Sequence, residues 1–184
     1  QAIAGALVPL LESHPITRGH VNFTDQSVNQ RLAMIASRNG KMATLDLSSA
    51  SDRVPLSLSM RMFDKAPDYQ GAIFACRSRR AEMPDGTLLH LGKFASMGSA
   101  LCFPIEAMYF YTLCIMALLE EQSLPVTYSS IKKVAKHVYV YGDDIIVPTT
   151  SATIVIDTLQ KYHCKVNVRK SLFTGYFRET FGQD

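Results

Sequence analysis

The stretch HVYVYGDDIIVP, at residues 137–148, decides what the sequence predicts for the rest of the chain. β-branched residues lie on both sides of Gly142-Asp143, and glycine accepts the positive φ that a tight hairpin turn requires. The stretch therefore predicts two antiparallel strands joined by a turn. The adjacent carboxylates of Asp143 and Asp144 repel each other, and a divalent cation is the simplest compensation. The alternative is a solvated turn that happens to carry two acids.

The composition is that of an ordinary globular protein with a single domain. Of the 184 residues, 47% are hydrophobic and 19% are charged, which suits a chain with a sizeable core. A net charge of +3 gives no argument for nucleic-acid binding by the whole chain, so any basic surface must be local. The candidates are Arg77, Arg79 and Arg80, and Lys132, Lys133 and Lys136. An ordinary solvated face is the alternative for both groups, and for the lysines it is the favoured one.

The four cysteines, at positions 76, 102, 114 and 164, are far apart in the sequence. This spacing argues against a zinc site and against a disulfide scaffold. Residues 101–119 are nearly all apolar, which raises the alternative of a membrane span. Pro104, Glu106 and the lack of basic flanks favour a buried core helix instead.

Turn and capping signals divide the rest of the chain into helices and strands. We expect helices at residues 24–38, 51–63, 67–75, 101–121 and 151–163, and a linker around Pro125. We expect strands at residues 41–47, 77–83, 87–94 and 164–168, and a strand pair within 171–181. The strand at 41–47 ends at Asp46 and is followed by the small polar residues of 48–52. An acid at the end of a strand is a common place for a catalytic group, although a turn or capping role would also explain Asp46.

Four segments together resemble the RNA-directed RNA polymerases of positive-strand RNA bacteriophages, the levivirus-type replicases. DLSSASD at residues 46–52 is similar to the first motif of the polymerase palm, motif A. Ser96-Met97-Gly98-Ser99 with Phe103-Pro104-Ile105-Glu106 occupies the place of motif B, and YGDD at 141–144 that of motif C. FRE at 177–179 with Gly182 is similar to a further segment of the family.

The resemblance implies an α+β fold, a polymerase palm whose antiparallel, RRM-like βαββαβ sheet is packed on helices. It also implies a single palm-centred catalytic domain over residues 1–184. Part of the fingers would lie at about residues 1–40 and 64–95, and most of the fingers and the thumb would be absent. The implied reaction is template-directed transfer of NTPs onto a 3′-hydroxyl by a two-Mg²⁺ mechanism, with Mn²⁺ as a substitute, in the replication of a phage RNA genome.

The family motifs also imply roles for individual residues. Asp46 and Asp143 are the expected principal metal ligands and catalytic residues, assisted by Asp144, with the Leu47 carbonyl completing a shell. The expected nucleotide-binding residues are Asp52, Ser96, Gly98 and Ser99. Tyr141, Gly142 and Arg178, in the motif segments, are expected to bind RNA. Arg77 and Arg79, of the local basic group named above, are also expected to bind RNA.

Two positions depart from the family pattern. Ser99 stands where the family usually has asparagine, and Pro104 stands where it has the first of two glutamates. The choice between Asp52 and Ser99 as the contact for the ribose 2′-hydroxyl therefore stays open. Lys161, Lys165 and Lys170 are equal candidates for the acid that protonates the leaving pyrophosphate. For at least two of them an ordinary solvated lysine is the favoured alternative.

Two other functions compete with the polymerase prediction. A reverse transcriptase also carries Tyr-x-Asp-Asp after two strands, but usually with a bulkier residue than Gly142. A catalytically silent RNA-binding domain of the same shape would use exposed sheet aromatics, whereas Tyr139 and Tyr141 lead into two acids. The polymerase prediction implies an RNA template, a nascent strand and NTPs as partners, host translation factors as further partners, no membrane, and the cytoplasm of the bacterial host.

Overall fold

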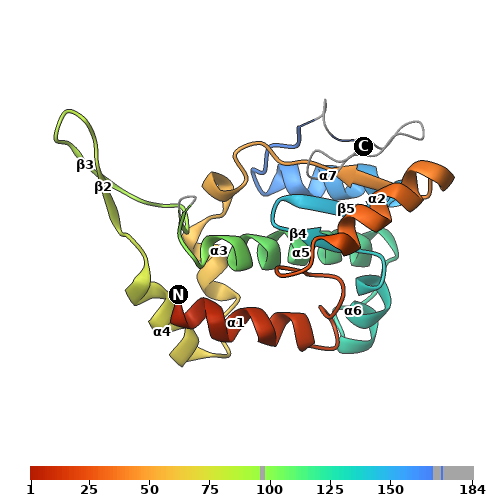
Figure 1. Ribbon diagram of the computed structural model, residues 1–184, viewed down its shortest axis with the longest axis horizontal. Helices are drawn as coiled ribbons and strands as arrows, with labels where there is room; N and C mark the ends of the chain where they lie inside the picture. Colours follow the sequence, from red (N-terminus) through yellow and green to blue (C-terminus); the bar gives the residue numbers. More distant parts are fainter. Residues whose placement is uncertain (96–97, 168–170, 172–184) are drawn as a thin grey trace.

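The computed structural model describes residues 1–95, 98–167 and 171. Helices surround a small central sheet, and one hairpin projects away from it (Figure 1). The helices are α1 Ala2–Ser13, α2 Ser27–Asn39, α3 Leu56–Arg61, α4 Pro67–Cys76, α5 Cys102–Glu121, α6 Tyr128–Ala135 and α7 Ala152–Lys161, with short 3₁₀ helices η1 Ser51–Arg53 and η2 Thr149–Ser151. The strands are β1 Met42–Leu45, β2 Arg80–Glu82, β3 Leu88–His90, β4 Tyr139–Tyr141 and β5 Asp144–Pro148.

The central sheet has the order β1-β5-β4, and both strand pairs are antiparallel. β4 and β5 form the predicted hairpin, in which Tyr141 pairs with Asp144. Gly142 has a φ of 60°, the conformation that a type II′ turn requires of its first central residue. β1 pairs with the other edge of β5, with Leu45 opposite Ile145. The mixed helix and antiparallel sheet that the sequence predicts is therefore confirmed.

Both faces of the sheet are covered. Ile145, Ile146 and Val147 are consecutive on β5 and each is fully buried, although successive strand residues point to opposite faces. α5 and α2 both contact the sheet, and α5 also packs against α7, α6 and α1 (Figure 1). α5 is long and apolar enough to cross a membrane, but 78% of its 18-residue apolar stretch is buried inside the protein. The prediction of a core helix for this segment is confirmed.

The structure differs from the predicted elements in several places. The helix expected at 51–63 is split into η1 and α3, because Pro55 has extended backbone and lacks the N–H that a continuous helix needs. The predicted linker around Pro125 is followed by α6, an unpredicted helix that Thr127 caps by accepting a hydrogen bond from the Ser130 N–H. The strands of the projecting hairpin are shorter than expected, so Arg77 and Arg79 both precede β2 and neither lies on a strand.

The predicted strand at 164–168 is present only as an isolated antiparallel bridge between Val166 and Leu47. Within the described residues the central sheet therefore has three strands, one fewer than a complete βαββαβ fold. The strand pair predicted within 171–181 lies outside the described residues, apart from Ser171.

Replacement of Gly142 tests how tightly the hairpin turn is packed. A Cβ added there would lie 2.3 Å from Cε2 of Phe103, in a backbone conformation with positive φ. We expect Gly142→Ala to lower the free energy of unfolding by at least about 1–2 kcal/mol, since side chains other than glycine disfavour this conformation. Urea unfolding of the chain measures the change.

Gly71→Ala is the matched control, because a Cβ at this position in α4 would meet nothing within 4 Å. Alanine is the better helix former, so Gly71→Ala should leave stability unchanged or raise it by up to about 1 kcal/mol. Equal effects of the two substitutions would contradict the packing of the turn against Phe103.

Candidate active site

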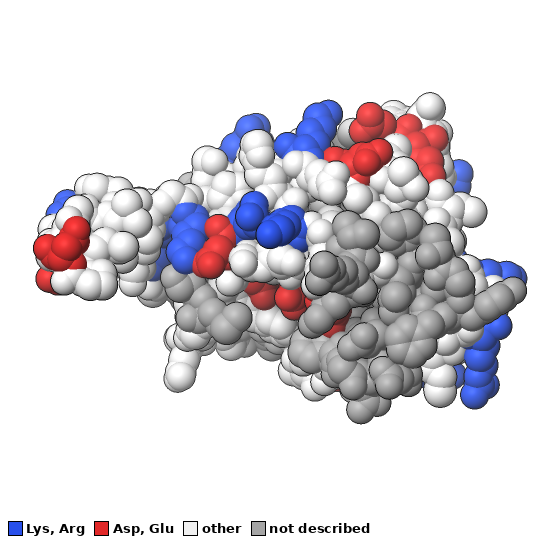
Figure 2. Space-filling model, turned by 90° about the horizontal axis from the view of Figure 1, so that it is seen from above, with Lys and Arg blue, Asp and Glu red and all other residues white. Residues whose placement is uncertain are grey.

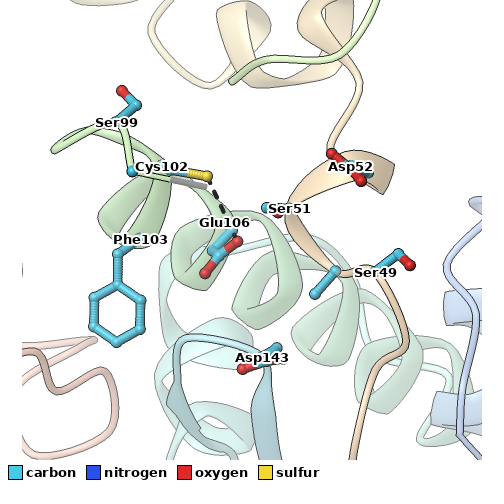
Figure 3. Close-up of a pocket in the computed structure, with 10 residues that line it drawn as sticks. Ser49, Ser51, Asp52, Ser99, Cys102, Phe103, Glu106 and Asp143 are labelled. Atoms are coloured by element: carbon cyan, nitrogen blue, oxygen red, sulfur yellow. Dashed lines mark hydrogen bonds between the residues drawn. The ribbon is translucent and has the colours of Figure 1, made fainter. Parts of the chain in front are cut away.

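A cavity of about 570 Å³ lies where three parts of the chain meet (Figure 3). One wall is formed by η1 and the loop that joins β1 to it. The start of α5 and the loop before it form the second wall, and the β4–β5 turn forms the third. The residues that line the cavity are Ser49, Ala50, Ser51, Asp52, Gly98, Ser99, Cys102, Phe103, Glu106 and Asp143.

The strand pairing brings the acids of two segments to the same end of the sheet. Leu45 pairs with Ile145, so Asp46 follows β1 at the end where Asp144 begins β5. Asp143 lies on the turn and lines the cavity. The Asp46 carboxylate accepts a hydrogen bond of 3.0 Å from the Asn167 amide, and its backbone N–H donates to Ser171 Oγ. Asp46 is thus fixed by residues near the C-terminal end of the described chain.

Glu106 is a buried acid in the cavity wall, with 8% of its surface exposed. Burial, and then the nearby negative charge of Asp143, raises the pKa of Glu106 to about 7. The Cys102 thiol lies one helical turn away, with its Sγ 3.8 Å from Glu106 Oε2. Burial and then the charge of Glu106 raise the pKa of Cys102 to about 12, so this thiol is protonated at neutral pH and is no nucleophile.

The cavity suits a cation more than an anion, because Glu106 and Asp143 line the same space and their carboxylates repel each other when both are ionised. Carboxylate and backbone carbonyl oxygens are also the ligands that Mg²⁺ takes. Among the described residues, however, no three His, Cys, Asp or Glu side chains gather closely enough to hold a metal ion. The expected ligand set of Asp46, Leu47, Asp143 and Asp144 therefore stays a prediction.

The structure brings three of the four predicted nucleotide-binding residues to the cavity. Asp52, Gly98 and Ser99 line it, and Ser96 lies outside the described residues. The Asp52 carboxylate forms an ion pair with the Lys93 ammonium group. Their roles in nucleotide binding remain predictions.

The predicted RNA-binding residues are scattered. Arg77 donates hydrogen bonds to the backbone carbonyls of Leu91, Lys93 and Phe94, and so is committed to its own chain. Arg79 lies 4.7 Å from the Phe74 ring in a cation–π contact. Tyr141 packs edge-on against Phe103, beside the buried Gly142. Arg178 lies outside the described residues.

Among the described residues, the Lys and Arg side chains on the face that Figure 2 shows fall into several separate groups and form no continuous basic surface. Lys161 and Lys165, two of the candidate acids, are exposed and do not line the cavity, while Lys170 lies outside the described residues.

Ser49, Ser51 and Cys102 line the cavity although the sequence predicted no role for them. Phe103 and Glu106 lie in the motif B segment but were given no role in the site, and Lys93 was not predicted as the partner of Asp52. Glu106 had a signal, because it is the one charge within the apolar stretch at 101–119. Ser49 has a φ of 54°, which is uncommon for a residue other than glycine, and nothing in the local sequence predicts it. Lys93 pairs with a residue 41 positions away, a contact that only the fold can create.

A comparison with solved structures supports the fold. Apo telomerase from Candida tropicalis, truncated from its C-terminal domain, superimposes with a TM-score of 0.53, covering 94% of this chain and 39% of that chain. The two sequences are 16% identical, so this similarity concerns the fold alone.

Curated relatives are found among phage polymerases. The RNA-directed RNA polymerase subunit beta of Qbeta virus (strain MX1) is 33% identical over 166 residues, which cover 89% of this chain and 26% of that protein. The beta chain of the polymerase of Enterobacteria phage GA is 36% identical over 163 residues, covering 88% of this chain and 28% of the relative. The polymerase beta chain of Escherichia phage MS2 is 33% identical over 162 residues, which cover 88% of this chain and 27% of the relative. The chain spans about a quarter of the length of these relatives.

A family model described as RNA replicase, beta-chain, matches residues 16–184. Together with the phage relatives, this match confirms the resemblance to levivirus-type replicases that the sequence motifs indicate. The chain belongs to the RNA replicase beta-chain family.

Proposed function

We propose that this chain is the catalytic part of an RNA-directed RNA polymerase, which adds NTPs to a 3′-hydroxyl under the direction of an RNA template and so replicates a phage RNA genome. The observation that carries the proposal is one cavity shared by Asp143, on the β4–β5 turn, and the loop that follows Asp46 on the neighbouring strand. The phage relatives, which are RNA-directed RNA polymerases by name, support the same activity.

The proposed architecture is a polymerase palm with an RRM-like sheet. The strand order β1-β5-β4 supports it, and so does the Leu47–Val166 bridge, which places a segment on the other side of β1. Residues 1–184 would form one palm-centred domain, with about 1–40 and 64–95 as part of the fingers. The length of the relatives supports the proposal that most of the fingers and the thumb belong to other parts of the polymerase.

The proposed metal ligands are the carboxylates of Asp46 and Asp143, assisted by Asp144 and the Leu47 carbonyl. Two bound Mg²⁺ ions, or Mn²⁺ in their place, would activate the 3′-hydroxyl and neutralise the leaving pyrophosphate. Asp143 would present its carboxylate from the cavity wall, and Asp46 from the adjoining strand end. Asp52, Gly98 and Ser99 would hold the nucleotide, because they line the same cavity.

Two observations weigh against the alternative functions. Reverse transcriptases usually carry a bulkier residue at the position of Gly142, and in this fold such a side chain would clash with the Phe103 ring. A silent RNA-binding domain needs exposed aromatics for base stacking, whereas Tyr139 contacts His20, with 4.6 Å between ring centroids, and Tyr141 packs against Phe103.

The proposed partners are an RNA template, a nascent strand and NTPs. Host translation factors are proposed as further partners on family resemblance alone, and the cytoplasm of the bacterial host is the proposed location. No membrane partner is proposed, since α5 is buried in the core.

Primer extension tests the proposed function. The protein encoded by the complete open reading frame that contains this chain should extend an RNA primer with NTPs when Mg²⁺ and an RNA template are present. Asp143→Asn should lower the rate by more than about a hundredfold, since changes around a metal site reach that size even without touching a ligand. Extension with dNTPs alone would support a reverse transcriptase and contradict the proposal.

Asp157→Asn is the matched control for this experiment, because it removes an exposed acid on α7 away from the cavity. It should leave the rate of extension unchanged. Full activity of Asp143→Asn would rule out Asp143 as a metal ligand.

Glu106 predicts a pH dependence of stability. Its pKa is about 7 in the folded protein, against an ordinary value of 4.5. Between these values the folded protein retains a proton that the unfolded chain has lost, so the free energy of unfolding falls as the pH rises. Glu106→Gln should remove this slope, which reaches at most about 1.4 kcal/mol per pH unit.

Urea unfolding at a series of pH values across this window measures the slope. Glu120→Gln, which changes an exposed acid on the same helix, should keep the wild-type slope. If Glu106→Gln kept the wild-type slope, the raised pKa of Glu106 would not be the cause of the slope.

A further inference from the structure

An ion pair at the edge of the cavity joins two segments that the sequence motifs leave separate. The Lys93 ammonium group contacts Oδ1 of Asp52. Asp52 lies on η1 and lines the cavity, on a different segment from Ser99 and Cys102 (Figure 3). Lys93 lies between the projecting hairpin and the loop that precedes α5.

The backbone around Lys93 is held firmly in place. An isolated antiparallel bridge pairs Lys93 with Pro55. The Leu56 N–H donates to the Gly92 carbonyl at 2.9 Å, and the Phe94 N–H donates to the Val54 carbonyl at 2.8 Å. Lys93 is thus anchored to the segment that directly follows η1, which carries Asp52.

Arg77 also holds the backbone around Lys93 in place. Its guanidinium donates to the carbonyls of Lys93 and Leu91, each at 3.0 Å, and to that of Phe94 at 3.1 Å. A planar guanidinium with several fixed donors orients such a segment better than one flexible ammonium group would. The Lys93 side chain therefore begins from a well-defined backbone position.

Asp52 by itself is less constrained. It lies on a helix of three residues, and its side chain is 55% exposed, against 26% for Lys93. Ion pairs this exposed contribute little to stability. The consequence of the contact is therefore orientation: Lys93 holds one carboxylate oxygen, and this fixes where the other oxygen lies.

The walls around Asp52 suit a hydroxylated ligand. Ser49, Ser51 and Ser99 line the cavity together with this carboxylate, and a carboxylate oxygen accepts a hydrogen bond from a hydroxyl group. The ribose of an NTP differs from that of a dNTP in one hydroxyl group. A site built to bond that hydroxyl group discriminates strongly against a ligand that lacks it.

We propose that Lys93 is a positioning residue for ribose selection, which holds the Asp52 carboxylate so that it accepts a hydrogen bond from the 2′-hydroxyl of the incoming NTP. This inference rests on the proposed polymerase function. It also assigns Arg77 to the support of Lys93, through the carbonyls that Arg77 binds.

Single-nucleotide incorporation by the protein from the complete open reading frame tests the inference. Lys93→Gln should lower kcat/KM for the NTP by about tenfold, the size expected for one hydrogen bond to a charged group. It should leave kcat/KM for the matching dNTP unchanged, so that discrimination falls by the same factor. Lys93→Arg keeps the positive charge and should restore most of the discrimination.

Two controls separate positioning from a general structural effect. Lys132→Gln, at an exposed position of α6, should leave both substrates unaffected. Lys93→Gln should shift the melting temperature by no more than about 2 °C, because the pair is exposed. In an Asp52→Asn background, Lys93→Gln should cause no further loss of discrimination, since both act through one carboxylate.

The outcomes distinguish this inference from the function on which it rests. Equal losses for NTP and dNTP would mean that Lys93 binds the triphosphate, and would overturn the inference. Unchanged discrimination in an active Lys93→Gln protein would also overturn it, while leaving the polymerase function intact. A wild-type protein that incorporates neither nucleotide would contradict the proposed function and the inference together.

Discussion

The pairing of β1 with β5 is the interaction on which the site depends. The register sets Leu45 opposite Ile145, and a slip of one residue would turn the buried side chains of β5 to the wrong faces. Ile145, Ile146 and Val147 are all fully buried and alternate between the two faces. Each side chain has to fit the close packing of its own face, and this disfavours the slip. Two acid-bearing segments from distant parts of the sequence therefore end side by side, as a consequence of ordinary hydrophobic packing.

α5 connects this arrangement to the core. Its first turns supply Cys102, Phe103 and Glu106 to the cavity, while most of the helix is buried among α7, α6 and the sheet. Phe103 fills the space beside Gly142, so the hairpin turn and the start of α5 are packed as one unit. The buried charge of Glu106 is unfavourable in such a place, and its proximity to Asp143 makes the cavity a better site for cations than for anions.

The sequence predicts well those elements whose signals are local. The β4–β5 hairpin, α2, α4, α5 and α7 all lie where turn, cap and hydrophobic patterns place them. The break at Pro55 and the Thr127 cap of α6 also have local signals in the sequence, a proline and a threonine before a helix. The site was harder to predict, because the clamp of Arg77 and the pairing of Lys93 with Asp52 join residues that only the folded chain brings together.

We propose that Asp46 and Asp143 together hold the catalytic cations. Crystals of the complete protein, soaked in Mn²⁺ and measured at the manganese absorption edge, test this claim most directly, because anomalous scattering locates the ion independently of activity. We expect a peak beside the carboxylates of Asp46 and Asp143, and we expect it to disappear in Asp143→Asn. A peak bound elsewhere, or none in a well-ordered crystal with both carboxylates accessible, would contradict it.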